Sequence, residues 1–183
     1  MKRKLCLILC ALAPAWALAA LSPAAAPAAV SAFLQAEGLE GESTNDKFPK
    51  AIDVLSWSWG VSNLDGKKPF FTSFSIQKNL DRTSPTLMEY AATGQVIPRA
   101  KLRVIKLGGD DSPEFLRYCF AGLRVMSIEQ SGSSGDSISE SMSFSYEYIV
   151  QRYQQQNEDG SLTAPVFGGF DIVKNLILPP GDC

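Results

Sequence analysis

Alternating hydrophobic and polar positions recur along most of the chain and predict a protein built mainly of β-strands. Successive side chains of a strand point to opposite faces, so this alternation marks strands with one buried face. The pattern predicts strands at 31–35, 52–60, 70–77, 100–107, 115–120, 123–129 and 138–150. Turns separate most of them and helices do not, which indicates an antiparallel barrel or sandwich.

One short helix interrupts the strands. Ser84 is a typical N-cap residue, Pro85 suits the first helical position, and Gly94 suits the residue after the last turn. Apolar residues at helical spacing predict a face that packs against the sheet: Leu87, Tyr90 and Ala91. The predicted fold class is therefore mainly β, an antiparallel barrel or sandwich with one short α-helix.

The segment 52–60 has two unlike faces. The alternation places three large apolar side chains on one face, which we expect in the core: Leu55, Trp57 and Trp59. The opposite face is small and partly hydroxylic, as suits a solvent-filled or closely approached surface: Val54, Ser56 and Ser58.

The N-terminus has the pattern of a secretory signal peptide. Three basic residues, Lys2 to Lys4, precede an apolar run from Leu5 to Ala13, and small residues offer cleavage sites after Ala19 or Ala28. The apolar run is far shorter than the roughly 20 residues that a membrane span needs. We therefore expect an exported protein, periplasmic or secreted, with no membrane insertion of the mature chain.

This pattern also divides the chain. We expect a signal peptide at 1–19, with cleavage as late as residue 28 as the alternative, and an Ala/Pro-rich linker at 20–30. One β domain follows at 31–176, and the C-terminal tail is 177–183.

Composition narrows the possible functions. The chain has 17 basic and 19 acidic residues, and without the leader 14 basic residues remain, a net charge of −5. An acidic chain is a poor partner for nucleic acid, whose phosphates require lysine and arginine. The sequence contains no histidine, which removes the commonest general base and the commonest metal ligand. We predict no enzymatic activity, no cofactor and no metal.

Carboxylates are the remaining candidates for acid and base chemistry or for binding a hard cation. They lie in polar segments that are typical of solvated turns: Glu40, Glu42, Asp46, Asp110 and Asp111.

Two of the four cysteines, Cys6 and Cys10, fall in the predicted leader, so Cys119 and Cys183 remain in the mature chain. They form a possible disulfide in an oxidising compartment. The alternative is a buried thiol in a strand and a separate thiol in the tail, because sequence does not fix the distance between them.

Several segments carry a family resemblance: GLEGES at 38–43, AIDVLSWSWGVS from Ala51, FSIQKNLDRTSPTLMEYAATGQVIPRAKLRVIKLGG from Phe74, SISESMSFSYEYIVQRY from Ser137, and DGSLTAPVFGGFDIVKN from Asp159. Together they lie within residues 32–175. They resemble the Hcp (haemolysin-coregulated protein) family, the tube proteins of bacterial type VI secretion systems.

The resemblance implies a small β-barrel of two packed sheets with one helix. It implies a homo-hexameric ring, a stack of rings that forms a tube, and a lumen that carries small effector proteins as cargo. Carried over to this sequence, Ser56 and Ser58 are candidate lumen-facing residues, with Trp57 and Trp59 packed behind them. The alternative is that these serines face solvent on a monomer.

The chain departs from the family in two places. It has a leader that a tube protein does not require, and its connection at 61–68 is short and poor in glycine. An alternative function is therefore an exported Hcp-like binding module or adhesin that works outside a secretion machine.

Overall fold

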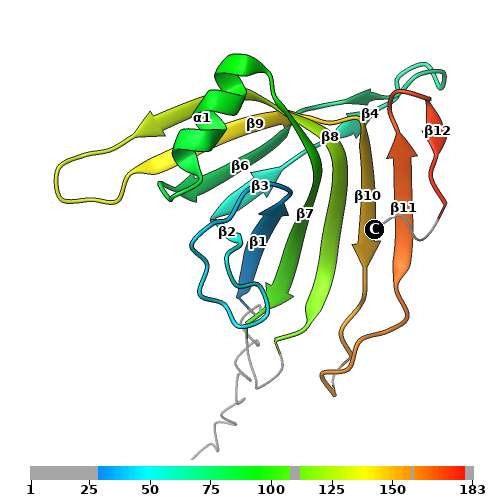
Figure 1. The fold of residues 1–183 in the computed structure, drawn as a ribbon. Coiled ribbons are helices and arrows are strands. Elements are labelled where there is room, and N and C mark those ends of the chain that lie inside the picture. Colours follow the sequence, from blue (N-terminus) through cyan, green and yellow to red (C-terminus); the bar gives the residue numbers. More distant parts are fainter. Residues whose placement is uncertain (1–28, 108–111, 158, 180–183) are drawn as a thin grey trace, which may run out of the picture.

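The computed structural model describes residues 29–107, 112–157 and 159–179. Within these residues the chain forms twelve β-strands and one α-helix (Figure 1). The elements in chain order are β1 (Val30–Ala36), β2 (Ile52–Val54), β3 (Ser56–Ser58), β4 (Val61–Ser62), β5 (Phe70–Phe71), β6 (Phe74–Asn79), α1 (Ser84–Thr93), β7 (Val96–Lys106), β8 (Glu114–Ser131), β9 (Ser139–Ser145), β10 (Tyr148–Tyr153), β11 (Val166–Asp171) and β12 (Leu176–Ile177).

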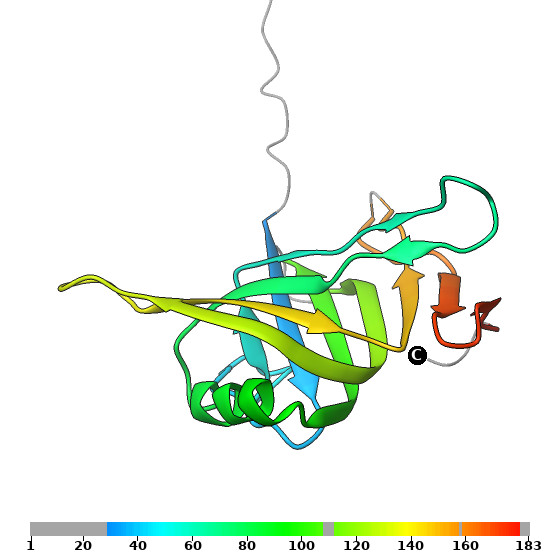
Figure 2. The same cartoon turned by 90° about the horizontal axis from the view of Figure 1, so that it is seen from above.

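The strands form two layers that share one long strand. In the first layer the strand order is β12-β11-β10-β8-β7-β1-β2, and in the second layer it is β3-β6-β9-β8, with antiparallel pairing throughout. The first half of β8 pairs with β10, and its second half pairs with β9. Strands β4 and β5 form a separate two-stranded hairpin that projects from the body (Figure 2).

The prediction of a mainly β fold with one helix is confirmed, but the barrel is not closed. Strands β10 to β12 continue the first layer beyond the second layer (Figure 1). The core lies between the two layers and is built from alternate residues of the facing strands. Its fully buried side chains include Phe74, Leu102, Phe120 and Met142.

The predicted strand at 52–60 is two short strands, and its expected alternation is wrong at one step. Val54 is buried, whereas Leu55 is 61% exposed. The chain bends at Leu55 because it passes there from the first layer, where β2 pairs with β1, to the second, where β3 pairs with β6. The backbone N–H of Leu55 donates to the carbonyl of Gln77 at 2.8 Å and fixes this crossing.

Two other predicted boundaries also differ from the structure. The predicted strands 115–120 and 123–129 are one strand, β8, which continues through Gly122 at a left-handed φ of 62°. The predicted strand 138–150 is two strands, because the chain leaves the second layer after Ser145 and enters the first at Tyr148.

Helix α1 begins one residue earlier than predicted. Thr83 is the N-cap residue and makes no side-chain capping bond, while Ser84 is the first helical residue and is buried. Ser84 leaves the cap position because its hydroxyl serves a buried network described below. Gly94 ends the helix in a left-handed conformation, as predicted. The helix packs against β8 through buried Leu87.

The predicted leader, most of the predicted linker, Asp110, Asp111 and Cys183 lie outside the described residues. Among the residues that the structure describes, no helix has the length and apolar character required to cross a membrane.

Candidate functional site: a hydroxyl-rich sheet face

The outward face of the second layer is lined with serine across all four strands. The strand register places four serines in one row: Ser58 of β3, Ser75 of β6, Ser143 of β9 and Ser127 of β8. Residues directly opposite each other on paired strands share a face of the sheet. The predicted candidate Ser58 is therefore one member of a row that crosses the layer.

A second row runs beside the first and contains Ser56. Its members are Ser56, Gln77, Ser141 and Glu129, again one from each strand. We call these eight residues the hydroxyl face: Ser56, Ser58, Ser75, Gln77, Ser127, Glu129, Ser141 and Ser143. Glu129 is the one charged residue among the eight.

Hydrogen bonds within the hydroxyl face run across the strands. The Ser56 hydroxyl donates to Gln77 Oε1 at 3.1 Å, and the hydroxyls of Ser127 and Ser143 lie 2.5 Å apart. Serine requires an adjacent base to act as a nucleophile, and the sequence has no histidine to supply one. The face therefore offers hydrogen-bond donors and acceptors to a partner.

The two tryptophans of the family signature lie behind the hydroxyl face. Trp57 stands opposite Ile76 in the sheet, and both pack with the core between the layers. Trp59 also packs against the core and makes an edge contact with Tyr118, with ring centroids 5.9 Å apart. These aromatic side chains support the backbone that presents Ser56 and Ser58.

Most of the hydroxyl face was not predicted from the sequence. Ser75 and Gln77 alternate with buried Phe74 and Ile76, and the serines of β9 alternate with buried Met142 and Phe144. This alternation was the available signal. It shows that each strand has a polar face, but only the pairing of the strands shows that these faces form one surface.

A buried ion pair lies at one end of the layer, under the start of α1. Lys78 and Glu140 stand opposite each other on β6 and β9, with Lys78 Nζ 2.6 Å from Glu140 Oε2, and both are buried. Lys78 Nζ also donates to Asp81 Oδ1 at 2.8 Å and to Ser84 Oγ at 3.0 Å. Charges buried together need this full set of partners, so the network fixes the helix to the layer.

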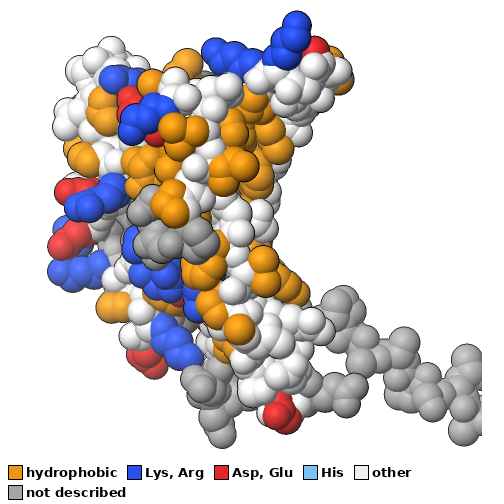
Figure 3. Space-filling view, turned by 90° about the vertical axis from the view of Figure 1, so that its right-hand side faces the viewer, with side chains coloured by type: hydrophobic (Ala, Val, Ile, Leu, Met, Phe, Trp, Pro, Cys, Tyr) orange, Lys and Arg blue, Asp and Glu red, His pale blue; other side chains and the backbone are white. Residues whose placement is uncertain are grey.

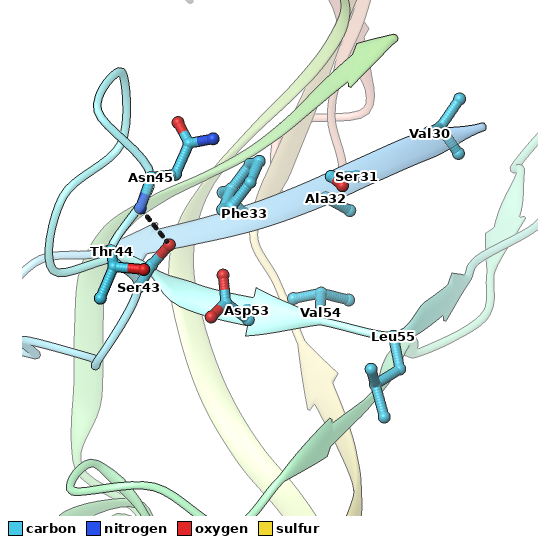
Figure 4. Close-up of a pocket in the computed structure, with 10 residues that line it drawn as sticks. All are labelled: Val30, Ser31, Ala32, Phe33, Ser43, Thr44, Asn45, Asp53, Val54 and Leu55. Carbon is cyan, nitrogen blue, oxygen red and sulfur yellow. Dashed lines mark hydrogen bonds between the residues drawn. The ribbon is translucent and has the colours of Figure 1, made fainter. Parts of the chain in front are cut away.

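A cavity of about 460 Å³ lies at the edge of the first layer (Figure 4). It is lined by the start of β1, the loop at 43–45 and the end of β2 (Figure 4). The backbone N–H of Asn45 donates to Ser43 Oγ at 3.4 Å at its rim. Asp53 is the one charged residue of its lining.

Of the carboxylates considered from the sequence, those that the structure describes, Glu40, Glu42 and Asp46, do not assemble into a metal site. Glu40 forms an exposed ion pair with Lys50 at 3.1 Å, and Glu42 accepts a hydrogen bond from the backbone of Arg82. The described part of the chain contains no group of three or more acidic, cysteine or histidine side chains placed to hold a metal ion.

Cys119 is buried in β8, on the outer face of the first layer, and is disulfide-bonded. Cys183 lies outside the described residues. The pairing of the two cysteines therefore stays a prediction.

Comparisons with known proteins give one consistent result. A family model described as "Type VI secretion system effector, Hcp" matches residues 33–153. Protein hcp1 of Pseudomonas aeruginosa is 31% identical over 159 residues, which cover 81% of this chain and 98% of the relative. The crystal structure of Hcp1 from Salmonella typhimurium has a TM-score of 0.73 at 32% identity and covers 82% of this chain and 99% of its own.

A further solved structure, described as a type six secretion system protein, has a TM-score of 0.77 at 26% identity, with 82% of this chain and all of that chain covered. The fold and these matches define a tube subunit of bacterial type VI secretion, which is the class that the sequence resemblance predicts. The chain belongs to the Hcp family.

Proposed function

We propose that this protein assembles into a six-membered ring whose hydroxyl face lines the central channel. The observation that carries the proposal is the pair of polar rows across β3, β6, β9 and β8, which is nearly free of charge. A surface of serine hydroxyls offers donors and acceptors in every direction. Such a surface suits a channel that holds different effector proteins and releases them again.

Closed rings also account for the free strand edges of the subunit. Within the described residues, β2 and β12 are the terminal strands of the first layer. An exposed strand edge is a site for pairing with another chain. A heterologous contact between two different edges closes into a ring when the rotation between copies is one sixth of a turn.

Native mass tests the ring. We expect light scattering of the exported protein to give six times the mass of its mature chain over a wide concentration range. A strictly monomeric protein across that range would contradict the proposal.

The position of the hydroxyl face in the ring is tested separately by labelling. We expect a gold label attached at Ser58→Cys to appear inside the central hole of negatively stained rings. The matched control is Met88→Cys, on an exposed position of α1, whose label should lie at the outer rim. If the Ser58→Cys label also lies at the rim, the assignment of the hydroxyl face to the channel is wrong, whereas the proposal of a six-membered ring is unaffected.

Export of the subunit forms a second part of the proposal. We infer that residues 1–19 are removed as a signal peptide and that the mature protein works outside the cytoplasm, in the periplasm or beyond the cell. The support is the basic, apolar and small-residue order of the N-terminus. N-terminal sequencing of the exported protein should begin at Ala20, or at Ala29 if the later site is used.

The predicted leader also favours the second candidate function, an exported Hcp-like binding module or adhesin. This candidate differs from the first in its native mass and in its binding surface. A monomer that recovers a partner from the periplasm, and still does so after Ser56→Arg and Ser58→Arg, would support the binding module and reject the channel.

A further inference from the structure

A recess of about 250 Å³ lies on the hydroxyl face, beside the row that contains Ser56. Its lining includes Gln77, Ser141 and Glu129 of that row, together with Leu55 at the crossing between the layers. The strand order β3-β6-β9-β8 places Leu55, next to β3, on one side and Glu129 of β8 on the other, with Gln77 and Ser141 between them. One subunit therefore supplies the walls and the floor.

Glu129 brings an unbalanced charge to this recess. Within the described part of the chain, its side chain makes no hydrogen bond or ion pair. The hydroxyls of Ser131 and Ser139, which also line the recess, bond to each other at 2.9 Å. Carboxylates elsewhere are paired with bases, as Glu114 is with Arg103 at 2.9 Å. Figure 3, which views the molecule from the side of β11 and β12, shows most acidic side chains of that face next to lysine or arginine.

The second carboxylate of the lining is already balanced. Glu140 Oε2 lies 2.6 Å from Lys78 Nζ, and Glu140 Oε1 accepts a hydrogen bond from Gln130. Both members of this ion pair are buried. Glu129 is therefore the carboxylate that a ligand in the recess would meet.

Leu55 gives the recess an apolar wall. Its side chain is 61% exposed and points away from β1 (Figure 4). Three strand spacings of about 4.8 Å separate the backbones of β3 and β8, about 14 Å in all. The volume is below the range of about 300–1,000 Å³ that is usual for small-molecule pockets, so it fits a single side chain. Lysine and arginine match its lining, because their stems pack on apolar surface while their heads carry the charge.

We propose that this recess binds a lysine or arginine side chain of a cargo protein. Glu129 pairs with the charged head, Leu55 contacts the stem, and the oxygens of Gln77 and Ser141 accept further hydrogen bonds from the head. The identification of the occupant as cargo rests on the proposed channel, in which the recesses of all six subunits face the lumen. The channel would then hold basic cargo more firmly than acidic cargo.

The affinity for a basic peptide tests the role of the charge. The probe is fluorescently labelled hexalysine, and fluorescence anisotropy gives its Kd for the purified protein. We expect Glu129→Gln to raise this Kd at least about fivefold. The matched control Glu89→Gln removes the same charge from an exposed position on α1 and should leave the Kd nearly unchanged. Equal effects of the two variants would show that hexalysine responds only to net charge, which would overturn the proposal.

The same measurement tests the apolar wall. We expect Leu55→Ser to raise the Kd of hexalysine about threefold, because the lysine stem loses its apolar contact. Met88→Ser is the matched control, since Met88 is 56% exposed on α1, and it should leave the Kd unchanged. An unchanged Kd for Leu55→Ser would remove Leu55 from the site and reject the match to a long side chain.

Cross-linking locates the occupant. A water-soluble carbodiimide activates a carboxylate, and a lysine amine held against it forms an amide while one carboxylate oxygen leaves with the urea. We expect hexalysine to be joined to Glu129 of the wild-type chain, as located by fragmentation of the linked peptide. Links found mainly at other exposed carboxylates, such as Glu40 or Glu89, would overturn the proposal.

These measurements are independent of the tests of the ring and the channel, because the recess is complete in one subunit. If the ring forms and the Ser58→Cys label lies in its hole, a missing link at Glu129 rejects the recess alone. If Glu129 is linked but the label lies at the rim, the occupant is not channel cargo, and that part of the proposal is wrong.

Discussion

At the scale of single residues, Lys78 and Glu140 are the most informative pair in the core. They continue the inward-facing alternation of β6 and β9, where the other inward residues are apolar. A charge at such a position is costly unless it is paired and hydrogen-bonded. Here the pair joins two strands of the second layer and reaches the start of α1 through Ser84.

Removing one partner of this pair should strongly destabilise the fold. We expect Lys78→Met to lower the free energy of unfolding by about 3–5 kcal/mol, because Glu140 is then left as an unpaired buried charge. The double variant Lys78→Met/Glu140→Leu should be less damaging than the single variant. Urea unfolding measures both.

An exposed pair provides the control. The side chains of Lys50 and Glu40 are 66% and 61% exposed and lie 3.1 Å apart. We expect Lys50→Met to change the free energy of unfolding by at most about 1 kcal/mol. Equal losses for Lys78→Met and Lys50→Met would show that the buried network contributes little.

At the scale of elements, the course of β8 depends on one residue. Gly122 has a left-handed φ of 62°, and a Cβ atom there would clash with the side chain of Glu147. Only glycine adopts this conformation without strain. The bend lets a single strand pair with β10 before it and with β9 after it.

Substitution of this residue should weaken the junction of the layers. We expect Gly122→Ala to cost about 1–3 kcal/mol in the free energy of unfolding, measured in urea. Gly168→Ala in β11 is the matched control, because nothing lies within 4 Å of its added Cβ and its φ is not left-handed. A similar loss in both variants would show that the conformation of Gly122 is not the cause.

Sequence alternation predicted the strands well wherever one strand stays in one layer. In β6 and β9 the buried residues recur at every second position; β9 lies within the predicted segment 138–150, and β6 overlaps the predicted segment 70–77 and ends two residues beyond it. The prediction was wrong where a strand changes layer, at Leu55 and around Tyr146, because the change reverses which side chains face the core. Such crossings depend on contacts between distant segments, which a local pattern does not contain.

The candidate site, too, was predicted only as far as local alternation reaches. Ser56 and Ser58 were predicted to lie on a polar face, and both are exposed. Their neighbours in the rows, such as Ser75 and Ser143, come from strands that are distant in sequence. Local alternation marked each of these residues as outward-facing. It gave no strand register, so the two rows were visible only in the fold.

At the scale of the whole molecule, the hairpin of β4 and β5 is an apolar arm. Leu64 at its tip is fully exposed, and Phe70 at its base is 67% exposed. Exposed apolar side chains gathered on one projection indicate a surface that another protein covers. In the proposed ring, we expect this arm to contact the next ring.

Charged substitutions in the arm should separate ring formation from stacking. We expect Leu64→Asp together with Phe70→Asp to leave the mass of a single ring unchanged and to weaken the association of rings by at least about tenfold, which corresponds to about 1.4 kcal/mol. Sedimentation at increasing protein concentration measures this association. Loss of the single ring itself would show that the arm acts between neighbours within a ring.

The sharing of β8 between the layers has a mechanical consequence. In a sandwich whose layers touch only through side chains, a sliding force is resisted by packing contacts alone. Here the layers are also joined by the continuous backbone of β8 and by the crossing at Leu55. Sliding one layer over the other would have to stretch covalent bonds or break rows of ladder hydrogen bonds together. A subunit pushed along one axis would therefore move as a rigid block.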